Sequence, residues 1–323
     1  MLLLTKVIIP GDKYTSANAL FEAGEYQKAA TAFYLLGNYS DARERSFALW
    51  SEIAQRESVS AAQVHTVGLR SDGTVVAVGS NRYGQCDVSD WTDIVAVAAG
   101  GLHTVGLRAD GTVIAVGTNS SGECDIGNWT DIVAIAAGQY HTVGLRADGT
   151  VVAVGENDYG KCYVGNWTDI VAIAAGNDHT VGLLADGTVV ATGNNEYGQR
   201  DVSDWTDIVA IAAGSNHTVG LRADGTVLAT GSNGSGVDDW KDIVAIATGP
   251  HAVGLRLDGT VVAVGSNSFG ECKVGAWTDI VGIATGTYHT VGLRADGTVV
   301  AVGSNDYGEC NVSKWKDIKL PKR

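Results

Sequence analysis

The side chains that could carry chemistry in this chain are its histidines, and they recur at a fixed interval. Each begins the motif His-[Thr/Ala]-Val-Gly-Leu, and five of the six intervals are 38 residues while the other is 34. The seven are His65, His103, His141, His179, His217, His251 and His289. Imidazoles repeated in this way could line a metal-binding ring or supply general bases. Because catalysis needs unlike groups that meet at one point, we expect histidines present once per repeat to be structural instead.

The five cysteines share one position of the same repeat, directly after Gly-[Gln/Glu/Lys]. They are Cys86, Cys124, Cys162, Cys272 and Cys310. Their spacings are whole numbers of repeats, so the chain has no Cys-x-x-Cys pair of metal ligands, and their number is odd. We expect small, buried, reduced side chains. No Ser-His-Asp set, carboxylate pair or phosphate loop stands out either, so the sequence predicts a protein that is not an enzyme and binds no cofactor or metal.

Composition and charge narrow the class of protein. With 45% hydrophobic and 18% charged residues the chain can bury a core, and 43 glycines with 3 prolines indicate many tight turns. A net charge of −14 disfavours a nucleic-acid surface. The apolar run in "MLLLTKVIIP" is too short for a signal-peptide core, and nothing later approaches a membrane span. We expect a soluble, monomeric, cytoplasmic protein, with secretion as the alternative.

One copy of the repeat predicts a set of short antiparallel strands. Residues 131–138 (DIVAIAAG), 142–147 (TVGLRA) and 150–155 (TVVAVG) have the length of strands, and Asp148-Gly149 is a hairpin signature between the last two. Residues 162–167 (CYVGNW) can supply a short fourth strand. The strands lack polar alternation, so both faces of the sheet must be covered, as in a blade packed between two others.

The ends of the array predict that it closes into a ring. The interval from Val59 to Leu320 is 262 residues, which equals six repeats of 38 and one of 34. The chain ends in "WKDIKL", residues 315–320, and the first copy lacks the corresponding strand. We therefore expect an all-β fold over residues 59–320: a closed seven-bladed β-propeller of four-stranded antiparallel blades. In it, the C-terminal strand completes the first blade and removes an exposed sheet edge.

The repeat also resembles a known family. "VAAGGLHTVGLRADGTVIAVGTNSSGEC" is similar to the regulator of chromosome condensation repeat, with its Gly-x-x-His, Asp-Gly and Gly-x-Asn-x-x-Gly-[Gln/Glu] landmarks. The short period resembles that of bacterial members. The resemblance implies a seven-bladed propeller but no single function, because relatives include a nucleotide exchange factor, a plant ultraviolet photoreceptor and an enzyme inhibitor.

Two features bear on those relatives. Seven of the eight tryptophans occur once per repeat, in Trp-[Thr/Lys]-Asp-Ile, so we interpret them as packing anchors and not as a photoreceptor cluster. No repeat exceeds 38 residues, which disfavours the blade insertion through which the exchange-factor relative engages its GTPase.

The N-terminal residues 1–58 form a separate segment in the sequence. Residues 12–57 show helical spacing of apolar residues, interrupted by Gly24 and Gly37, and predict three short helices. The pattern resembles a tetratricopeptide-like helical hairpin. A helical cap on the propeller and a docking module both remain open.

The positions that vary between copies carry the functional prediction. One variable pair precedes each histidine and a second follows the Asn near the end of each copy, and in an antiparallel meander both fall at one end of the sheet. The candidate partner-binding residues at these positions are Tyr83, Leu102, Tyr140, Asp158, Tyr159, Asp178, Glu196, Tyr197, Phe269, Tyr288 and Tyr307. Turns that tolerate any residue are the alternative explanation. In the enzyme inhibitor of this family, aromatic residues at the same loop positions bind the target enzyme.

We therefore expect a non-enzymatic scaffold that binds a protein partner through its diversified loop face. A regulator of a GTPase resembling a nucleotide exchange factor, or an enzyme inhibitor, that uses the same face is the alternative. The sequence does not name the partner.

Overall fold

The computed structural model describes residues 10–22, 58–232 and 236–318, and divides the chain into two compact units, Met1–Gln55 and Arg56–Arg323. In the first unit it describes one helix, α1 (Pro10–Glu22), which begins at a proline, a residue well suited to the first helical turn. This helix begins two residues before the predicted helical range, 12–57, and overlaps its first part; the other two predicted helices lie outside the described residues. No helix in the described part of the chain is long and apolar enough to cross a membrane.

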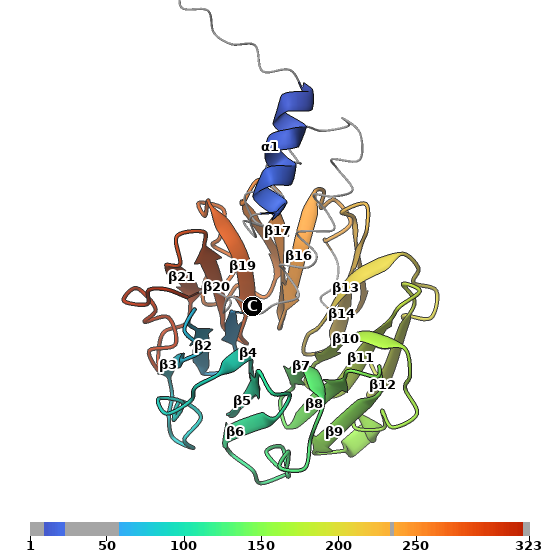
Figure 1. Cartoon of the computed structure of the whole chain (residues 1–323). Helices are drawn as coiled ribbons and strands as arrows, with labels where there is room; N and C mark the ends of the chain where they lie inside the picture. Colours follow the sequence, from blue (N-terminus) through green and yellow to red (C-terminus); the bar gives the residue numbers. More distant parts are fainter. Residues whose placement is uncertain (1–9, 23–57, 233–235, 319–323) are drawn as a thin grey trace, which may run out of the picture. The chain divides into compact units, whose positions relative to one another are not determined.

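The second unit consists of three-stranded antiparallel sheets, each formed by consecutive strands in sequence order. The first four sheets are β1 (Val59–Ala61), β2 (His65–Leu69) and β3 (Val75–Gly79); β4 (Ile94–Ala99), β5 (His103–Arg108) and β6 (Val113–Gly117); β7 (Ile132–Ala137), β8 (His141–Arg146) and β9 (Val151–Gly155); β10 (Ile170–Ala175), β11 (His179–Leu184) and β12 (Val189–Gly193). The last three are β13 (Ile208–Ala213), β14 (His217–Arg222) and β15 (Val227–Gly231); β16 (Ile243–Thr248), β17 (His251–Arg256) and β18 (Val261–Gly265); β19 (Ile280–Thr285), β20 (His289–Arg294) and β21 (Val299–Gly303). The seven sheets follow one another around a common centre, with the first strand of each innermost, as in a β-propeller (Figure 1).

Local sequence explains why each repeat folds into this unit. At the β8–β9 hairpin, Gly149 adopts φ 80°, and Asp148 Oδ1 accepts hydrogen bonds from the Thr150 backbone N–H at 2.9 Å and hydroxyl at 2.6 Å. The middle strand is the most buried, because neighbouring sheets cover both of its faces. The absence of polar alternation in the sequence follows from this double coverage.

The tryptophans fill the gaps between neighbouring sheets. Trp129 is 6% exposed, and its ring lies over the backbone of Gly144 in β8, where a Cβ would come within 2.7 Å of Cζ3. The ring belongs to a core cluster that includes Val105 and Leu107 of β5 and contacts Val152 of β9. The same Trp–Gly contact recurs in the other repeats, as the packing-anchor interpretation expects.

The predicted fourth strand is replaced by a series of turns, so the prediction of four-stranded blades is wrong for the described residues. In residues 162–167 the backbone N–H of Val164 donates to Cys162 O, and that of Trp167 donates to Val164 O, both at 2.9 Å. Donors used within the segment cannot form a ladder with the third strand, Val151–Gly155. The segment has the length of a strand but the bonding of consecutive turns.

Contacts also join the first sheet to the last. His289 Nε2 and Thr66 Oγ1 are 2.7 Å apart, and Trp315 lies over Gly68 as the other tryptophans lie over their glycines. Ile318 forms a single antiparallel bridge with Arg70, in the position that Ile132 occupies opposite Arg146 in the third sheet. Residues 319 and 320 of the predicted clasp lie outside the described residues.

Candidate binding face

Strand register decides which loops share an end of each sheet. In the third sheet, His141 pairs with Gly155 and Leu145 with Val151. The β7–β8 loop and the turns after β9 therefore lie at one end, and the Asp-Gly hairpin lies at the other. The same register recurs in the other sheets. We call the end that carries the β7–β8 loop, the turns after β9 and their equivalents the loop face.

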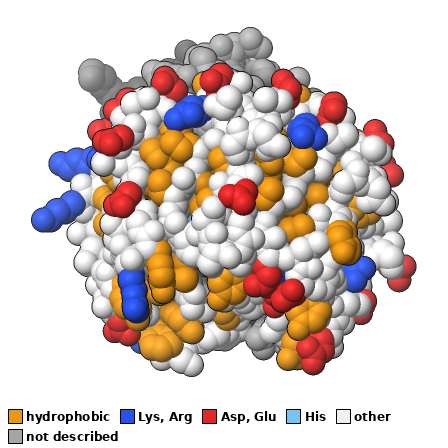
Figure 2. Space-filling model, turned by 90° about the horizontal axis from the view of Figure 1, so that it is seen from below, with side chains coloured by type: hydrophobic (Ala, Val, Ile, Leu, Met, Phe, Trp, Pro, Cys, Tyr) orange, Lys and Arg blue, Asp and Glu red, His pale blue; other side chains and the backbone are white. Residues whose placement is uncertain are grey.

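Most of the predicted binding residues are exposed on the loop face. Among the predicted residues, the exposed aromatic side chains are Tyr83 at 48%, Tyr159 at 68%, Tyr197 at 51%, Phe269 at 52%, Tyr288 at 39% and Tyr307 at 61%. Asp158 and Glu196 are exposed as well, whereas Leu102, Tyr140 and Asp178 are half-buried. Figure 2 shows one side of the molecule, on which acidic side chains are spread among hydrophobic ones.

The structure brings together only some of these residues. Phe269 and Tyr288, from adjacent repeats, meet edge to face with ring centroids 5.2 Å apart. Asp178 pairs with the buried Lys161 of the preceding repeat. Tyr140 contacts its neighbour Gln139, whose Nε2 donates to the Tyr140 hydroxyl at 3.3 Å. The remaining candidates are distributed over the repeats and do not form one cluster.

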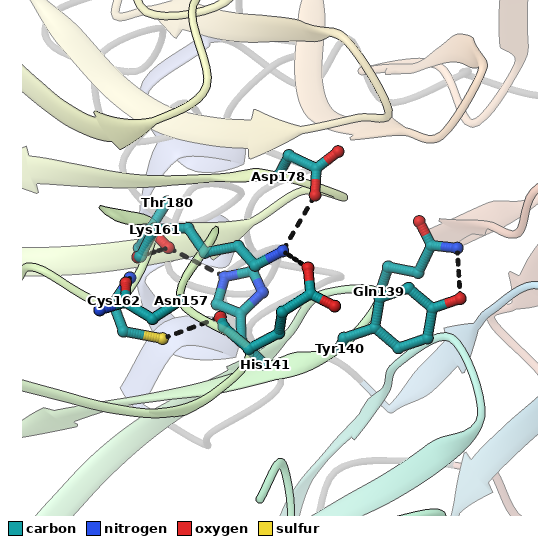
Figure 3. Close-up of polar contacts among 9 residues, drawn as sticks. Gln139, Tyr140, His141, Asn157, Lys161, Cys162, Asp178 and Thr180 are labelled. Atoms are coloured by element: carbon teal, nitrogen blue, oxygen red, sulfur yellow. Dashed lines mark hydrogen bonds and ion pairs between the residues drawn. The ribbon is translucent and has the colours of Figure 1, made fainter. Parts of the chain in front are cut away.

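The histidines are buried links between neighbouring sheets. His141 Nε2 lies 2.9 Å from Thr180 Oγ1, and because that hydroxyl donates its proton to Lys161 O at 2.7 Å, the imidazole must be the donor to it (Figure 3). The equivalent pairs are His65–Thr104, His103–Thr142, His179–Thr218, His251–Thr290 and His289–Thr66. His217 instead pairs with Thr248, because Ala252 stands where the other repeats have threonine.

These histidines are held neutral. Burial lowers the pKa of His141 to about 3 and that of His103 to about 4. The Nδ1 atom packs against a glycine backbone: a Cβ on Gly138 would lie 2.5 Å from His141 Nδ1. In the described part of the chain no group of three or more His, Cys, Asp or Glu side chains could hold a metal ion. This geometry supports the structural interpretation.

The cysteines are only half-buried, not fully buried as predicted. Cys162 Sγ donates to Glu156 O at 3.4 Å, and each of the other four contacts the equivalent carbonyl. Burial raises the pKa of the Cys162 thiol to about 11, so the thiol stays protonated at neutral pH. The turns that replace the fourth strand lie at the periphery of each sheet, which is why burial there is incomplete.

In six repeats a buried residue stands two positions after the second residue of the variable pair that follows the third strand. In five turns its side-chain oxygen accepts the backbone N–H two residues earlier, at 2.7–2.9 Å. The acceptors are Gln85, Glu123, Gln199, Glu271 and Glu309. The third repeat has Lys161 at this position, and a lysine side chain cannot accept a hydrogen bond.

Lys161 is fully buried and forms two ion pairs. Nζ lies 2.6 Å from Glu156 Oε1 and 2.9 Å from Asp178 Oδ1, so the side chain links the third repeat to the fourth (Figure 3). Burial acts to lower the pKa of Lys161, but the hydrogen bonds and charges of the two carboxylates outweigh it and raise that pKa. The lysine is therefore charged.

Sequence analysis missed Lys161 and Tyr163. Tyr163 is 71% exposed, the highest value among the large hydrophobic side chains of the described residues. It stands where the second repeat has Asp125, whose carboxylate accepts from Asn119 Nδ2 at 2.8 Å. Both residues depart from the repeat, and a position-by-position comparison of the turns across the copies would have found them.

A cavity of about 260 Å³ lies where the first strands converge. It is lined by glycine and alanine backbone and by the first residue of several variable pairs, such as Gln63, Gln139, Asn177, Ser215 and Thr287. Most second residues of these pairs, including Leu102, Tyr140 and Asp178, are not part of its lining. The variable pairs therefore divide between the cavity and the surrounding loop face.

Solved structures with similar folds come from several organisms. The ectodomain of the receptor kinase ACR4 from Arabidopsis thaliana aligns with a TM-score of 0.63 at 20% identity, covering 77% of this chain and 97% of that one. Prp20p from Saccharomyces cerevisiae aligns with a TM-score of 0.59 at 18% identity, covering 84% and 88%. Human WBSCR16 aligns with a TM-score of 0.51 at 18% identity, covering 84% and 81%. At these identities the likeness concerns the fold. No curated protein matches the chain in a sequence comparison.

The family assignment rests on the repeat itself. The regulator of chromosome condensation (RCC1) repeat matches residues 58–85, 94–123, 132–161, 170–199, 208–237 and 280–309. The copy that these matches omit contains His251, and it is the one with Ala252 in place of threonine and with Gly249-Pro250 before the histidine. The matches together cover more than half of the chain, which therefore belongs to the RCC1 repeat family.

Proposed function

We propose that this protein is a non-enzymatic scaffold that binds a protein partner through the loop face. The observation that carries the proposal is that large exposed aromatic side chains occur in several repeats at the same end of the sheets, among them Tyr159, Tyr197 and Tyr307. Tyrosine and phenylalanine lose little conformational entropy on binding, and they are frequent hot spots of protein interfaces.

Charge favours a protein partner with a basic or polar rim. Asp158, Asp178 and Glu196 lie among the aromatic side chains, and the chain carries a net charge of −14. Complementary charge would speed association at low ionic strength more than it would set the affinity. A nucleic acid would be repelled by the same charges.

Alanine variants of the loop face test the proposal. A partner captured from a lysate of the source organism and identified by mass spectrometry would be titrated against the purified wild type, Tyr159→Ala and Tyr197→Ala. Each substitution is expected to weaken binding by about 1–3 kcal/mol without changing thermal unfolding, because both rings are exposed.

A matched control comes from the opposite end of the sheets. Arg146→Ala at the β8–β9 hairpin is expected to leave the affinity unchanged. A partner whose cross-links map to the Asp-Gly hairpins or to residues 12–57 would show that the loops are only tolerant turns, and the proposal would fail.

We also infer that the seven sheets form a closed ring, with the C-terminal segment acting as the clasp of the first sheet. In support, the His289–Thr66 contact repeats the His–Thr link of the other neighbouring sheets. Ile318 is fully buried and shares a core cluster with Val59 of β1 and Val291 of β20. A closed ring would hold the loops of the face at fixed distances from one another.

Regulation of a GTPase through the same face is the second candidate. The observation in its favour is the fold likeness to Prp20p, whose structure was described together with its binding to Gsp1p and histones. Release of a fluorescent nucleotide from a small GTPase, measured with and without this protein, tests it. An unchanged rate across a panel of GTPases would leave the scaffold, or an enzyme inhibitor on the same face, as the remaining proposal.

A further inference from the structure

We propose that residues 156–163, which we call the third turn, recognise an arginine- or lysine-bearing segment of the protein partner, and that Lys161 sets the conformation in which they do so. The inference rests on the proposed function and deepens it, because it names the chemistry of the partner and the part of the loop face that recognises it.

The third turn has a backbone conformation of its own. In five other repeats a buried glutamine or glutamate accepts the N–H two residues earlier, but Lys161 cannot accept that of Tyr159. Tyr159 has φ 62°, within a short 3-10 turn, Asp158–Gly160. Elsewhere in the described residues, positive φ at a non-glycine occurs only at the aspartate of the Trp-[Thr/Lys]-Asp motif. Among the six turns that the structure describes in full, the left-handed conformation of Tyr159 therefore accompanies the one that lacks an acceptor; residues 233–235, in the turn of the fifth repeat, lie outside the described residues.

Lys161 stabilises this conformation from below the surface. Its two ion pairs tie the third turn, through Glu156, to the β10–β11 loop, through Asp178. Each carboxylate uses one oxygen for the ammonium group and remains about one-third exposed: 30% for Glu156 and 33% for Asp178. Among the described residues, the second oxygen of each has no hydrogen-bond partner. The positive charge is thus buried while negative charge faces outward.

Two aromatic residues of the third turn lie between these two carboxylates in the sequence, and their rings project into solvent. Tyr159 is 68% exposed and Tyr163 is 71% exposed, more than any other large hydrophobic side chain in the described part of the chain. Aromatic faces bind guanidinium and ammonium groups through cation–π contacts, and carboxylates bind them through charge-assisted hydrogen bonds. A turn that offers both suits a basic side chain.

In the first repeat, the tyrosine at the position of Tyr159 already has a cation from the chain itself over its ring. The guanidinium of Arg82 lies over the ring of Tyr83, 5.8 Å from its centroid. The residue before Tyr159 is Asp158, so the chain does not supply a cation from the equivalent position. In the third repeat this position is open to a cation from the partner.

A peptide titration followed by nuclear magnetic resonance tests the inference. The probe is a synthetic peptide of alternating arginine and glycine, with a glutamate–glycine peptide as its control. The arginine peptide is expected to shift the amide resonances of residues 156–163 and 178, and the glutamate peptide is expected to leave them unchanged. Tyr159→Ala and Tyr163→Ala, both at exposed positions, are each expected to weaken binding of the arginine peptide about tenfold. Unchanged affinity in both variants would overturn the proposal.

Lys161→Gln separates conformation from charge. Glutamine restores the acceptor present in Gln85 and Gln199, so the turn is expected to adopt the conformation of the other repeats and the arginine peptide to bind about tenfold more weakly. Gln199→Glu is the matched control: it makes the same change of one negative unit but keeps an acceptor, as Glu271 does, and is expected to retain binding. If the Lys161→Gln variant bound the arginine peptide equally or more tightly, the charge of the turn alone would control binding, and the proposal that Lys161 sets the binding conformation would be overturned.

The outcomes distinguish this inference from the proposed function. Resonance shifts confined to other loops of the loop face would refute the role of the third turn and leave the scaffold proposal standing. Shifts confined to the Asp-Gly hairpins would count against both.

Discussion

At the scale of single residues, the repeat makes one set of side chains structural and leaves another free to vary. His141 shows the first kind: it is buried, neutral and hydrogen-bonded to Thr180 of the next sheet. Tyr159 shows the second kind: its side chain is exposed, and the packing of the sheets does not depend on it. Lys161 stands between the two, because it is buried as a structural residue would be and yet changes the shape of an exposed turn.

The buried histidines predict a loss of stability in mild acid. Burial lowers their pKa values from 6.5 to about 3 or 4, so the unfolded chain binds protons that the folded chain excludes. The stabilisation is fully present above pH 6.5 and is lost as the pH falls towards the folded values. Each histidine contributes a slope of about 1.4 kcal/mol per pH unit within this window.

Urea unfolding at pH 7, 6 and 5 measures this slope. The hairpin aspartates, such as Asp148, have pKa values lowered by hydrogen bonds to threonine, so their effect is confined to more acidic solutions. A free energy of unfolding that stays constant from pH 7 to pH 5 would contradict the burial of neutral imidazoles.

At the scale of elements, each sheet depends on a close approach between a tryptophan and a strand glycine. The middle strand carries glycine where the indole of the preceding segment comes close to the backbone, as Trp129 does at Gly144. The first strand has a register shift between Ile132 and Ala134, and the expected fourth strand consists of turns. The sheet is therefore set by packing against its neighbours as much as by strand propensity.

Gly144→Ala tests this close approach. The added Cβ would lie 2.7 Å from Trp129 Cζ3, and the buried indole has little room to move. Overpacking is expected to destabilise the protein by about 1–3 kcal/mol, although alanine in a strand would otherwise restrict the unfolded chain favourably. Thermal and urea unfolding provide the measurement.

Gly165→Ala is the matched control for that prediction, since nothing lies within 4 Å of its added Cβ. Its effect is expected to stay within about 0.5 kcal/mol. Equal stability of the two variants would argue that the Trp–Gly contact is loose.

At the scale of the whole β unit, stability depends on contacts between neighbouring sheets. Most of these contacts join sheets that follow each other along the chain, and the contacts of β1 with β19 and β20 join its two ends. Ile318 and Trp315 supply side chains to the gap between the first and last sheets. Without the contact between the first and last sheets, the array would expose a sheet edge at each of its two ends.

Removal of residues 316–323 tests the dependence on the C-terminal segment. The truncated protein loses the fully buried Ile318 and its bridge to Arg70, so it is expected to unfold less cooperatively or to aggregate. Calorimetry and size-exclusion chromatography report the two outcomes, and a shorter truncation that removes only residues 321–323 is the control. An unchanged melting transition in the longer truncation would contradict closure by the C-terminus.

The sequence by itself determined the repeat, its three principal strands, the Asp-Gly hairpins and the end of the sheet at which the variable residues lie. These features depend on local turn chemistry and on apolar runs of strand length, both readable along the chain. Only the tertiary structure decided that the fourth segment forms turns, that the cysteines are half-buried, and that Lys161 sits between Glu156 and Asp178. The physical reason is that burial and contacts between repeats, such as Lys161 with Asp178, depend on how neighbouring repeats pack, and a local pattern does not contain that packing.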